Sequence, residues 1–346
     1  MKHLWIMLLV CGLAIPAYAA EISPPPVSGE AVTLMPDGMP SFGEGLWYIV
    51  QSAVKALRPD LNQSCRVCLS VIGITILISI LNGMSGKTAA LVGFAGVLAI
   101  ATVLLGSVST LIHTAADTVK EISDYGKLLL PVLTASLAAQ GGATGSAALY
   151  TGTAFFDALL GTVIGSVLVP MVYMFLALSV GSCALGEEYL KKLQDLLKWF
   201  ISWLLKTVLY VFTGYMSITG VISGGADKAA LKATKLTISG AVPVVGGIMS
   251  DASETILVGA GVVKGAVGAY GMWAVIAITV LPFLRIGILY LLLRITGAVC
   301  SVFSAPKIVE LLQCFTDAMG FLLGMTGTVS LLFMISIVCF LRGTGV

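Results

Sequence analysis

Charged residues are scarce in this sequence. Only 10% of its 346 residues are Asp, Glu, Lys or Arg, whereas 58% are hydrophobic. Soluble proteins carry about 25% charged residues, so this composition excludes a water-soluble globular domain. The net charge of +2 is small and spread along the chain, so we expect no nucleic-acid partner.

Histidine is almost absent, which removes most of the material for catalysis. The two histidines are His3 and His113, so a histidine-based metal site or a Ser-His-Asp triad has almost no material. Cys65 and Cys68 form a single C-x-x-C, a weak signal for metal binding or redox chemistry when no second pair accompanies it. No catalytic dyad, phosphate loop or metal cage is recognisable. We therefore predict a non-enzymatic protein without a cofactor.

The amino terminus has the pattern of a secretory signal. Residues 1–20 contain a polar start, an apolar core and an A-x-A cleavage site at Ala17-Tyr18-Ala19. An uncleaved anchor is the alternative; in both cases residue 21 onward begins outside the cytoplasm. Residues 21–41 are rich in proline and predict an extracytoplasmic tether without a packed core.

Residues 42–60 predict an amphipathic helix. Leu46, Ile49, Val50, Ala53 and Leu57 recur with helical spacing on one face. The sequence of Arg58-Pro59 predicts the end of this helix. Such a helix could lie on the membrane surface or pack on a partner, and its sequence does not decide between them.

Long apolar runs dominate the rest of the chain, and a helix needs about 20 apolar residues to span a bilayer. We predict an all-α polytopic membrane protein with about six full transmembrane helices, the first pair within residues 61–112. The predicted spans are Val67–Leu81, Thr88–Ile112, Val163–Leu185, Trp199–Ser223, Ala266–Leu293 and Ala318–Leu341. Two short amphipathic helices, Glu187–Lys198 and Pro306–Phe315, are expected to lie along the interface between spans.

Two further stretches, Leu128–Ala158 and Ser239–Gly265, contain too many small, kink-prone or charged residues for a simple span. We predict that they are interrupted or re-entrant helices that meet near the middle of the membrane.

The prolines indicate an internal two-fold repeat. Pro131 and Pro170 are 39 positions apart, as are Pro243 and Pro282. The two pairs are offset by 112 residues, and a similar order of elements follows each. We therefore divide the membrane region into residues 113–225 and residues 226–346. Repeats with broken helices occur in transporters and in membrane scaffolds. Parallel and inverted halves both remain open, because the lysines do not favour one orientation.

Charges within apolar stretches are candidate functional residues, because a charge at the bilayer centre costs about 3 kcal/mol. The candidates for a pathway or structural role are the charged residues Asp251, Glu254, Lys264 and Arg285, together with Pro131, Pro243 and Pro282 of the proline repeat. Helix capping from Ser250 is an adequate alternative explanation for Asp251 and Glu254. Asp157 and Lys206 are expected at an interface, whereas Arg285, close after Pro282, is expected to face the protein interior.

Two runs carry a family likeness: Thr237–Gly271, which contains SGAVPVVGGIMSD, and Leu128–Gly142, LLLPVLTASLAAQGG. Together with the signal, the proline-rich arm and the polytopic body, they resemble stage III sporulation protein AE of endospore-forming bacteria. The resemblance implies a role in spore formation, in the mother-cell membrane that surrounds the forespore. It also implies membership of a set of proteins, encoded together, that builds a channel-like complex between the two cells. No catalytic residues are implied.

Three functional classes follow. The first is a non-enzymatic membrane subunit of a secretion-like complex, whose partners are other membrane subunits, the lipid bilayer and further copies of the chain. The second is a permease or conduit that itself moves a small solute. The third, a membrane enzyme, lacks any supporting constellation of residues.

Overall fold

The computed structural model describes residues 25–27, 29–36, 41–84, 89–139, 143–218, 266–303 and 306–342. Its elements are a 3-10 helix η1 (Gly29–Leu34), α2 (Phe42–Ala56), α3 (Arg58–Met84), α4 (Ala89–Ala139), α5 (Ala143–Val163), a π-helical turn η2 (Ile164–Leu168), α6 (Val169–Leu185), α7 (Glu188–Ile218), α10 (Ala266–Ser301) and α11 (Pro306–Arg342). The described residues contain no strand.

Six helical segments are long and apolar enough to cross a membrane. They are Arg58–Gly83, Ala90–Ala135, Leu149–Leu185, Glu188–Tyr215, Val267–Ser301 and Pro306–Leu341. The chain is therefore an all-α polytopic membrane protein, as its composition predicts.

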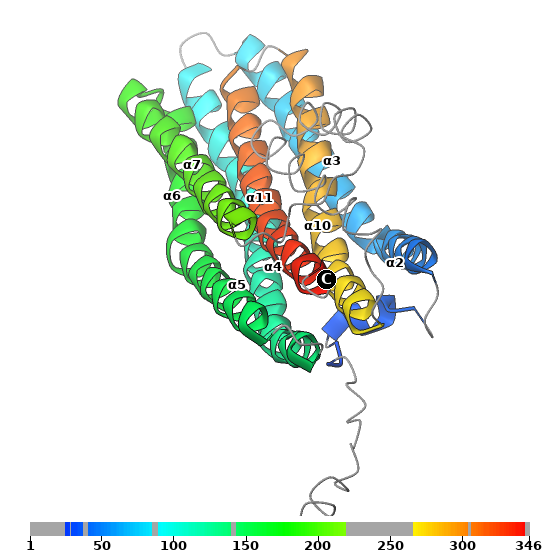
Figure 1. The fold of residues 1–346 in the computed structure, drawn as a ribbon. Helices are drawn as coiled ribbons and strands as arrows, with labels where there is room; N and C mark the ends of the chain where they lie inside the picture. Colours follow the sequence, from blue (N-terminus) through cyan, green and yellow to red (C-terminus); the bar gives the residue numbers. More distant parts are fainter. Residues whose placement is uncertain are drawn as a thin grey trace, which may run out of the picture.

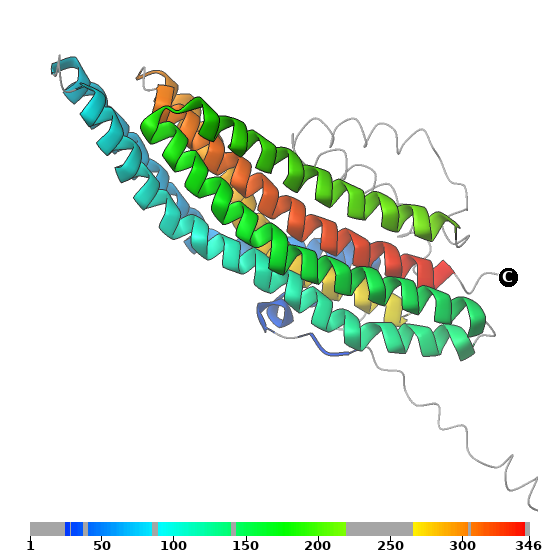
Figure 2. The same cartoon turned by 90° about the vertical axis from the view of Figure 1, so that its left-hand side faces the viewer.

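The long helices form one elongated bundle (Figures 1 and 2). We call one end the Pro306 end, where α3, α6 and α10 finish and α4, α7 and α11 begin. At the other, the Ala139 end, α4, α7 and α11 finish and α5 and α10 begin. The two views also show α3 starting about halfway along the bundle, beside α10.

Helix α11 is the centre of the bundle. Every residue from 318 to 340 is buried, and α4, α6, α7 and α10 all pack against it. Association in lipid depends on close packing, which small residues permit. Gly126 of α4 provides such an approach, because a Cβ at this position would lie 2.0 Å from Cζ of Phe333.

The helices of the two predicted halves run in the same direction: α6 and α10 run toward the Pro306 end, and α7 and α11 run back from it. The ion pairs between α7 and α11 also indicate a parallel arrangement. Lys191 contacts Glu310 and Lys198 contacts Asp317, so the residue later in α7 pairs with the residue later in α11. This direction is the one that parallel halves require. The sequence repeat itself stays a prediction.

Helix α2 confirms the amphipathic pattern and packs within its own chain. Its buried residues Gly45, Ile49 and Ala53 face α10. A capping box starts the helix: the Ser41 hydroxyl accepts from the Glu44 N–H, and the Glu44 carboxylate accepts from the Ser41 N–H. The Ser41 hydroxyl also donates to that carboxylate. These bonds hold the pKa of Glu44 below its ordinary value.

Three helices, α7, α11 and α4, differ from the sequence prediction. Residues 187–198 and 306–315 are not separate interfacial helices, because α7 and α11 begin at Glu188 and Pro306 and continue unbroken into their spans. No glycine or proline lies between each amphipathic start and its apolar continuation, so nothing interrupts the helical hydrogen bonding. Helix α4 likewise continues past His113 through Pro131 to Ala139, giving a length of roughly 76 Å.

The proline-rich arm is also more ordered than a tether. Within it, η1 buries Ala31 and Leu34 and packs against α10. The predicted signal, residues 1–20, and the stretch Ser239–Gly265 lie outside the described residues. The stretch Leu128–Ala158 contains the end of α4 and the start of α5, both at the Ala139 end of the bundle rather than near its middle (Figure 2).

Candidate functional site

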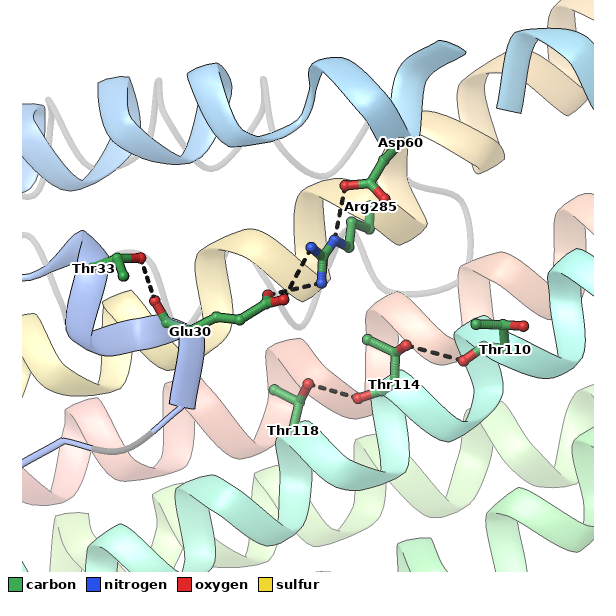
Figure 3. Close-up of polar contacts among 7 residues, drawn as sticks. All are labelled: Glu30, Thr33, Asp60, Thr110, Thr114, Thr118 and Arg285. Carbon is green, nitrogen blue, oxygen red and sulfur yellow. Dashed lines mark hydrogen bonds and ion pairs between the residues drawn. The ribbon is translucent and has the colours of Figure 1, made fainter. Parts of the chain in front are cut away.

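Arg285 of α10 is the centre of a three-residue ion cluster (Figure 3), located where α3 begins beside α10. Its Nε donates to Oδ2 of Asp60 at 2.9 Å, and its Nη1 donates to Oε2 of Glu30 at 2.9 Å. Asp60 lies in the first turn of α3 and Glu30 in η1. One guanidinium on α10 therefore holds the start of α3 and the amino-terminal arm together.

The geometry of this cluster suits a structural role. Arg285 and Asp60 retain 25% and 30% of their side-chain exposure, and Glu30 retains 66%. Guanidinium–carboxylate bonds of this kind are stronger than neutral ones. Beside the cluster, Figure 3 shows Thr114 and Thr118 of α4, whose hydroxyls donate to carbonyls one turn earlier. The pathway role predicted for Arg285 remains untested.

The other predicted site residues are not gathered around Arg285. Pro282 lies within α10, one turn before it, but Pro131 lies within α4 toward the Ala139 end. Leu129 packs on Gly271, which places Pro131 about three turns from Pro282 along the bundle. Pro243, Asp251, Glu254 and Lys264 lie outside the described residues.

A second polar site lies between α7 and α11, which we call the α7–α11 seam: Lys191, Gln194, Lys198, Glu310, Cys314 and Asp317. Nζ of Lys198 lies 2.6 Å from Oδ2 of Asp317, and Lys191 pairs with Glu310 two turns earlier. Between them, Nε2 of Gln194 donates to Sγ of Cys314 at 2.9 Å.

A cavity of about 550 Å³ opens along the seam. Besides the seam residues, its wall contains Asp195, Ser301, Pro306, Val309 and Gln313. Sequence reasoning missed this site because it treated the two amphipathic starts as separate helices. The signal was present, since Lys191 and Lys198 are spaced like Glu310 and Asp317, two turns apart. Both seam lysines are paired with carboxylates of α11.

Asp157 is buried within the protein, and the interfacial position predicted for it stays a prediction. It lies on α5 with 5% exposure, and its Oδ2 accepts from the Ser123 hydroxyl of α4 at 2.8 Å. A buried carboxyl group needs such a partner, because burial without a hydrogen bond is costly. The pair therefore ties α4 to α5 within the Ala139 half of the bundle.

The remaining candidates offer little chemistry. Cys65 and Cys68 lie one turn apart on α3 with free thiols. Lys206 is exposed on α7. Among the described residues, no group of three or more His, Cys, Asp or Glu side chains is arranged to hold a metal ion.

Comparisons with known proteins identify a family for this chain. The family model for stage III sporulation protein AE matches residues 40–343. Stage III sporulation protein AE of Bacillus subtilis (strain 168) is 23% identical over 296 residues, which cover 83% of this chain and 74% of the relative. No solved structure matches. Because the family model covers most of the sequence, the chain belongs to the stage III sporulation protein AE family.

Proposed function

We propose that this protein is a non-enzymatic integral membrane subunit of a trans-envelope, secretion-like channel complex required for sporulation. It would act in the mother-cell membrane around the forespore, after its signal peptide has placed the amino-terminal arm outside the cytoplasm. The observation that carries the proposal is the match of residues 40–343 to a sporulation family, together with six apolar helices long enough to span.

The packing of α11 supports a subunit over a self-contained conduit. A passage through one chain would follow the bundle axis, yet α11 occupies that axis and is buried from 318 to 340. The aromatic rings of Phe315, Phe321 and Phe333 are fully buried along it. Among the described residues the bundle axis is thus filled by side chains, which favours a passage between subunits, either further copies of the chain or other membrane proteins of the complex.

A non-enzymatic role is supported by how the polar groups are used. In the described residues, Arg285 and both seam lysines are held by carboxylates, and Asp157 is bonded to Ser123. Catalytic acids, bases and nucleophiles need a group within reach of a substrate. These groups instead join one helix to another.

A permease that moves a small solute is the second candidate. Two observations favour it: the buried Asp157 within a candidate span, and the polar cavity along the α7–α11 seam. Ionisable residues within membrane segments often mark substrate or proton pathways.

Genetic replacement tests the proposal. The gene would be expressed in an endospore former whose own family member has been deleted, and heat-resistant spores would be counted. We expect the intact chain to restore spores. Failure of a stably inserted chain to restore any would contradict the proposal. Purified protein in liposomes provides the second arm: uptake of a defined solute by the chain alone would favour the permease.

A further inference from the structure

Several contacts define one level across the middle of the bundle. On α3 and α10 it is marked by Asp60 bound to Arg285. On α4 and α6 it is marked by His113, whose Nε2 lies 3.4 Å from the Tyr173 hydroxyl. Helices α3 and α4 are antiparallel, and Ile78 of α3 packs on Gly96 of α4. Asp60 precedes Ile78 by the same number of residues by which position 114 follows Gly96. Asp60 therefore lies beside residue 114, at the level of His113.

The same level crosses α7 close to Lys198. Phe175, half a turn beyond Tyr173, packs edge-to-face on Phe321 with ring centroids 5.3 Å apart. Phe321 is one turn beyond Asp317, the ion-pair partner of Lys198. His113 on one side of the bundle and the turn after Lys198 on the other are therefore at nearly equal height.

On α4 the surface is apolar from this level toward the Pro306 end, and on α3 it is apolar beyond the exposed Arg66, which lies less than two turns after Asp60. Leu69, Leu77 and Leu91 are 66%, 59% and 68% exposed there. Toward the Ala139 end, α4 instead exposes ionisable side chains on successive turns: His113, Asp117, Lys120, Asp124 and Lys127. Helix α2 lies beside this boundary with Trp47 69% exposed. Aromatic residues of this kind favour the membrane–water interface.

On the α7 side, the order is reversed. Toward the Pro306 end, α7 exposes the charged residues Lys191, Lys192 and Asp195, with the half-buried Lys198 one turn further along. Toward the Ala139 end it exposes apolar and aromatic side chains, including Tyr210 and Val211 at 56% and 55%. The stacked rings of Trp199 and Trp203, with centroids 6.0 Å apart, lie at the boundary. Lys206 is the only charged residue from 199 to 218, and its long side chain can reach the interface.

The strip formed by α5, η2 and α6 connects the two apolar regions. It packs against α4 on one side and α7 on the other. Residues 149–185 contain a single acidic or basic residue, Asp157, which is buried. The apolar surface therefore continues from the Pro306 half of α4 to the Ala139 half of α7.

We infer that the bundle lies obliquely in the bilayer, so that its lipid-facing band crosses from the Pro306 half of α3 and α4 to the Ala139 half of α7. A slab about 30 Å thick, perpendicular to the bundle axis, would place the exposed charges of either α4 or α7 in hydrocarbon. Each such charge costs about 3 kcal/mol at the bilayer centre. An oblique slab avoids both costs and accommodates the 36 residues of α10, which are roughly 54 Å long. The implied tilt exceeds the average of about 20° for membrane helices.

Two pairs of positions at equal height test this orientation. Asp124 and Val211 form the first pair, because their sequence neighbours are connected through α5. Phe212 packs on Phe156 of α5, and the next residue, Asp157, accepts a hydrogen bond from Ser123. Lys191 and Leu77 form the second. A series of contacts relates their heights from helix to helix. From α7 to α11, Lys191 pairs with Glu310. From α11 to α10, Leu312 lies 3.9 Å from the Cβ position of Gly297, and from α10 to α3 the Cys300 thiol donates a hydrogen bond to the Thr75 hydroxyl.

Each of the four positions would be changed to cysteine in a Cys65→Ser background, spin-labelled and reconstituted in phosphatidylcholine–phosphatidylglycerol vesicles. Collision with oxygen reports lipid, and collision with a water-soluble nickel chelate reports water. We expect Val211→Cys and Leu77→Cys to favour oxygen several-fold, and Asp124→Cys and Lys191→Cys to favour the chelate.

An upright bundle would give both members of a pair the same preference and would overturn the inference. A label at position 211 that neither reagent reaches would also overturn it, because protein rather than lipid would then cover α7. Tyr210→Cys, Leu69→Cys and Lys120→Cys provide second labels on the same faces if a first variant does not fold.

Discussion

Lys198 of α7 and Asp317 of α11 form an ion pair of 2.6 Å between two helices that run in the same direction. Parallel neighbours of this kind are not linked by a short loop, so side chains must set their relative height. Together with Lys191–Glu310 and Gln194–Cys314, this pair fixes α7 on the central helix. The stability of that attachment can be measured directly.

Replacing Asp317 by alanine should lower the free energy of unfolding by about 1 kcal/mol, because the half-buried Lys198 ammonium loses its partner. The double exchange Lys198→Asp with Asp317→Lys should recover most of the loss. Thermal unfolding in detergent provides the measurement. Glu310→Ala is the matched control: its pair is more exposed, with 56% and 41% of the side chains accessible, so its loss should be near zero. Equal losses at both sites would contradict this account of the seam.

Removal of Asp60 should loosen the amino-terminal arm more than removal of Glu30. Asp60 is the less exposed acceptor of Arg285, and its loss leaves the guanidinium with one exposed partner. We expect faster proteolysis between residues 29 and 41 in Asp60→Asn than in Glu30→Gln, with a cost of about 1–3 kcal/mol for the former. If Arg285→Met left the arm as protected as in the parent chain, the cluster would not be its anchor.

Gly126→Ala should destabilise the contact between α4 and α11 by about 1–3 kcal/mol, because the added methyl overlaps the Phe333 ring. Gly106→Ala on the same helix is the control, since no atom lies within 4 Å of its Cβ position. The control should be neutral or gain up to about 1 kcal/mol from better helix propensity. A thermal midpoint of Gly126→Ala equal to that of the parent would show that the two helices are not closely packed.

Ser123→Ala should cost about 1–3 kcal/mol, because it leaves the Asp157 carboxyl buried without its donor. Asp157→Asn keeps the shape and a hydrogen bond to Ser123, so we expect a smaller loss. Comparing the two variants by thermal unfolding and by spore counts separates helix attachment from proton transfer. If Asp157→Asn were stable yet abolished sporulation, the carboxyl group itself would be required, which would favour the permease.

The start of α2 should depend on pH through Glu44. Its pKa is lowered by hydrogen bonds from Ser41, so the folded state favours the charged carboxylate. That contribution is complete above the ordinary pKa of glutamate and is lost as the pH falls through the lowered value. Amide exchange in the first turn of α2 should therefore accelerate, relative to the intrinsic rate, in acid. Glu44→Gln should remove this dependence, whereas Glu188→Gln should preserve it.

Local composition was sufficient to predict the membrane spans. Six apolar runs became six long helices because each exceeds or approaches the length that crosses a bilayer. The amphipathic α2 was also found correctly, because its face repeats within a few turns. The prediction of helix ends was less accurate. The segment that contains Lys191 and Lys198 has the sequence pattern of an interfacial helix, yet it is the first part of α7, and both lysines bind α11.

Partners distant in sequence were not predictable. Arg285 contacts Asp60 and Glu30 across 225 and 255 positions, and a single sequence contains no information that pairs them. The buried position of Asp157 has the same cause, because it depends on Ser123 of the preceding helix. Pro131 shows the converse, since a residue that disfavours helices lies inside a helix stabilised by its neighbours.

Affinity purification from sporulating cells tests the central claim most directly. A tagged chain that restores spores in the deletion strain would be extracted with mild detergent, and its partners would be identified by mass spectrometry. We predict that integral membrane proteins encoded beside it are recovered in constant proportion, and that Asp317→Ala or Asp60→Asn reduces their yield only when the bundle itself is destabilised. Recovery of the chain alone, from cells in which it fully restores sporulation, would contradict its role as a subunit.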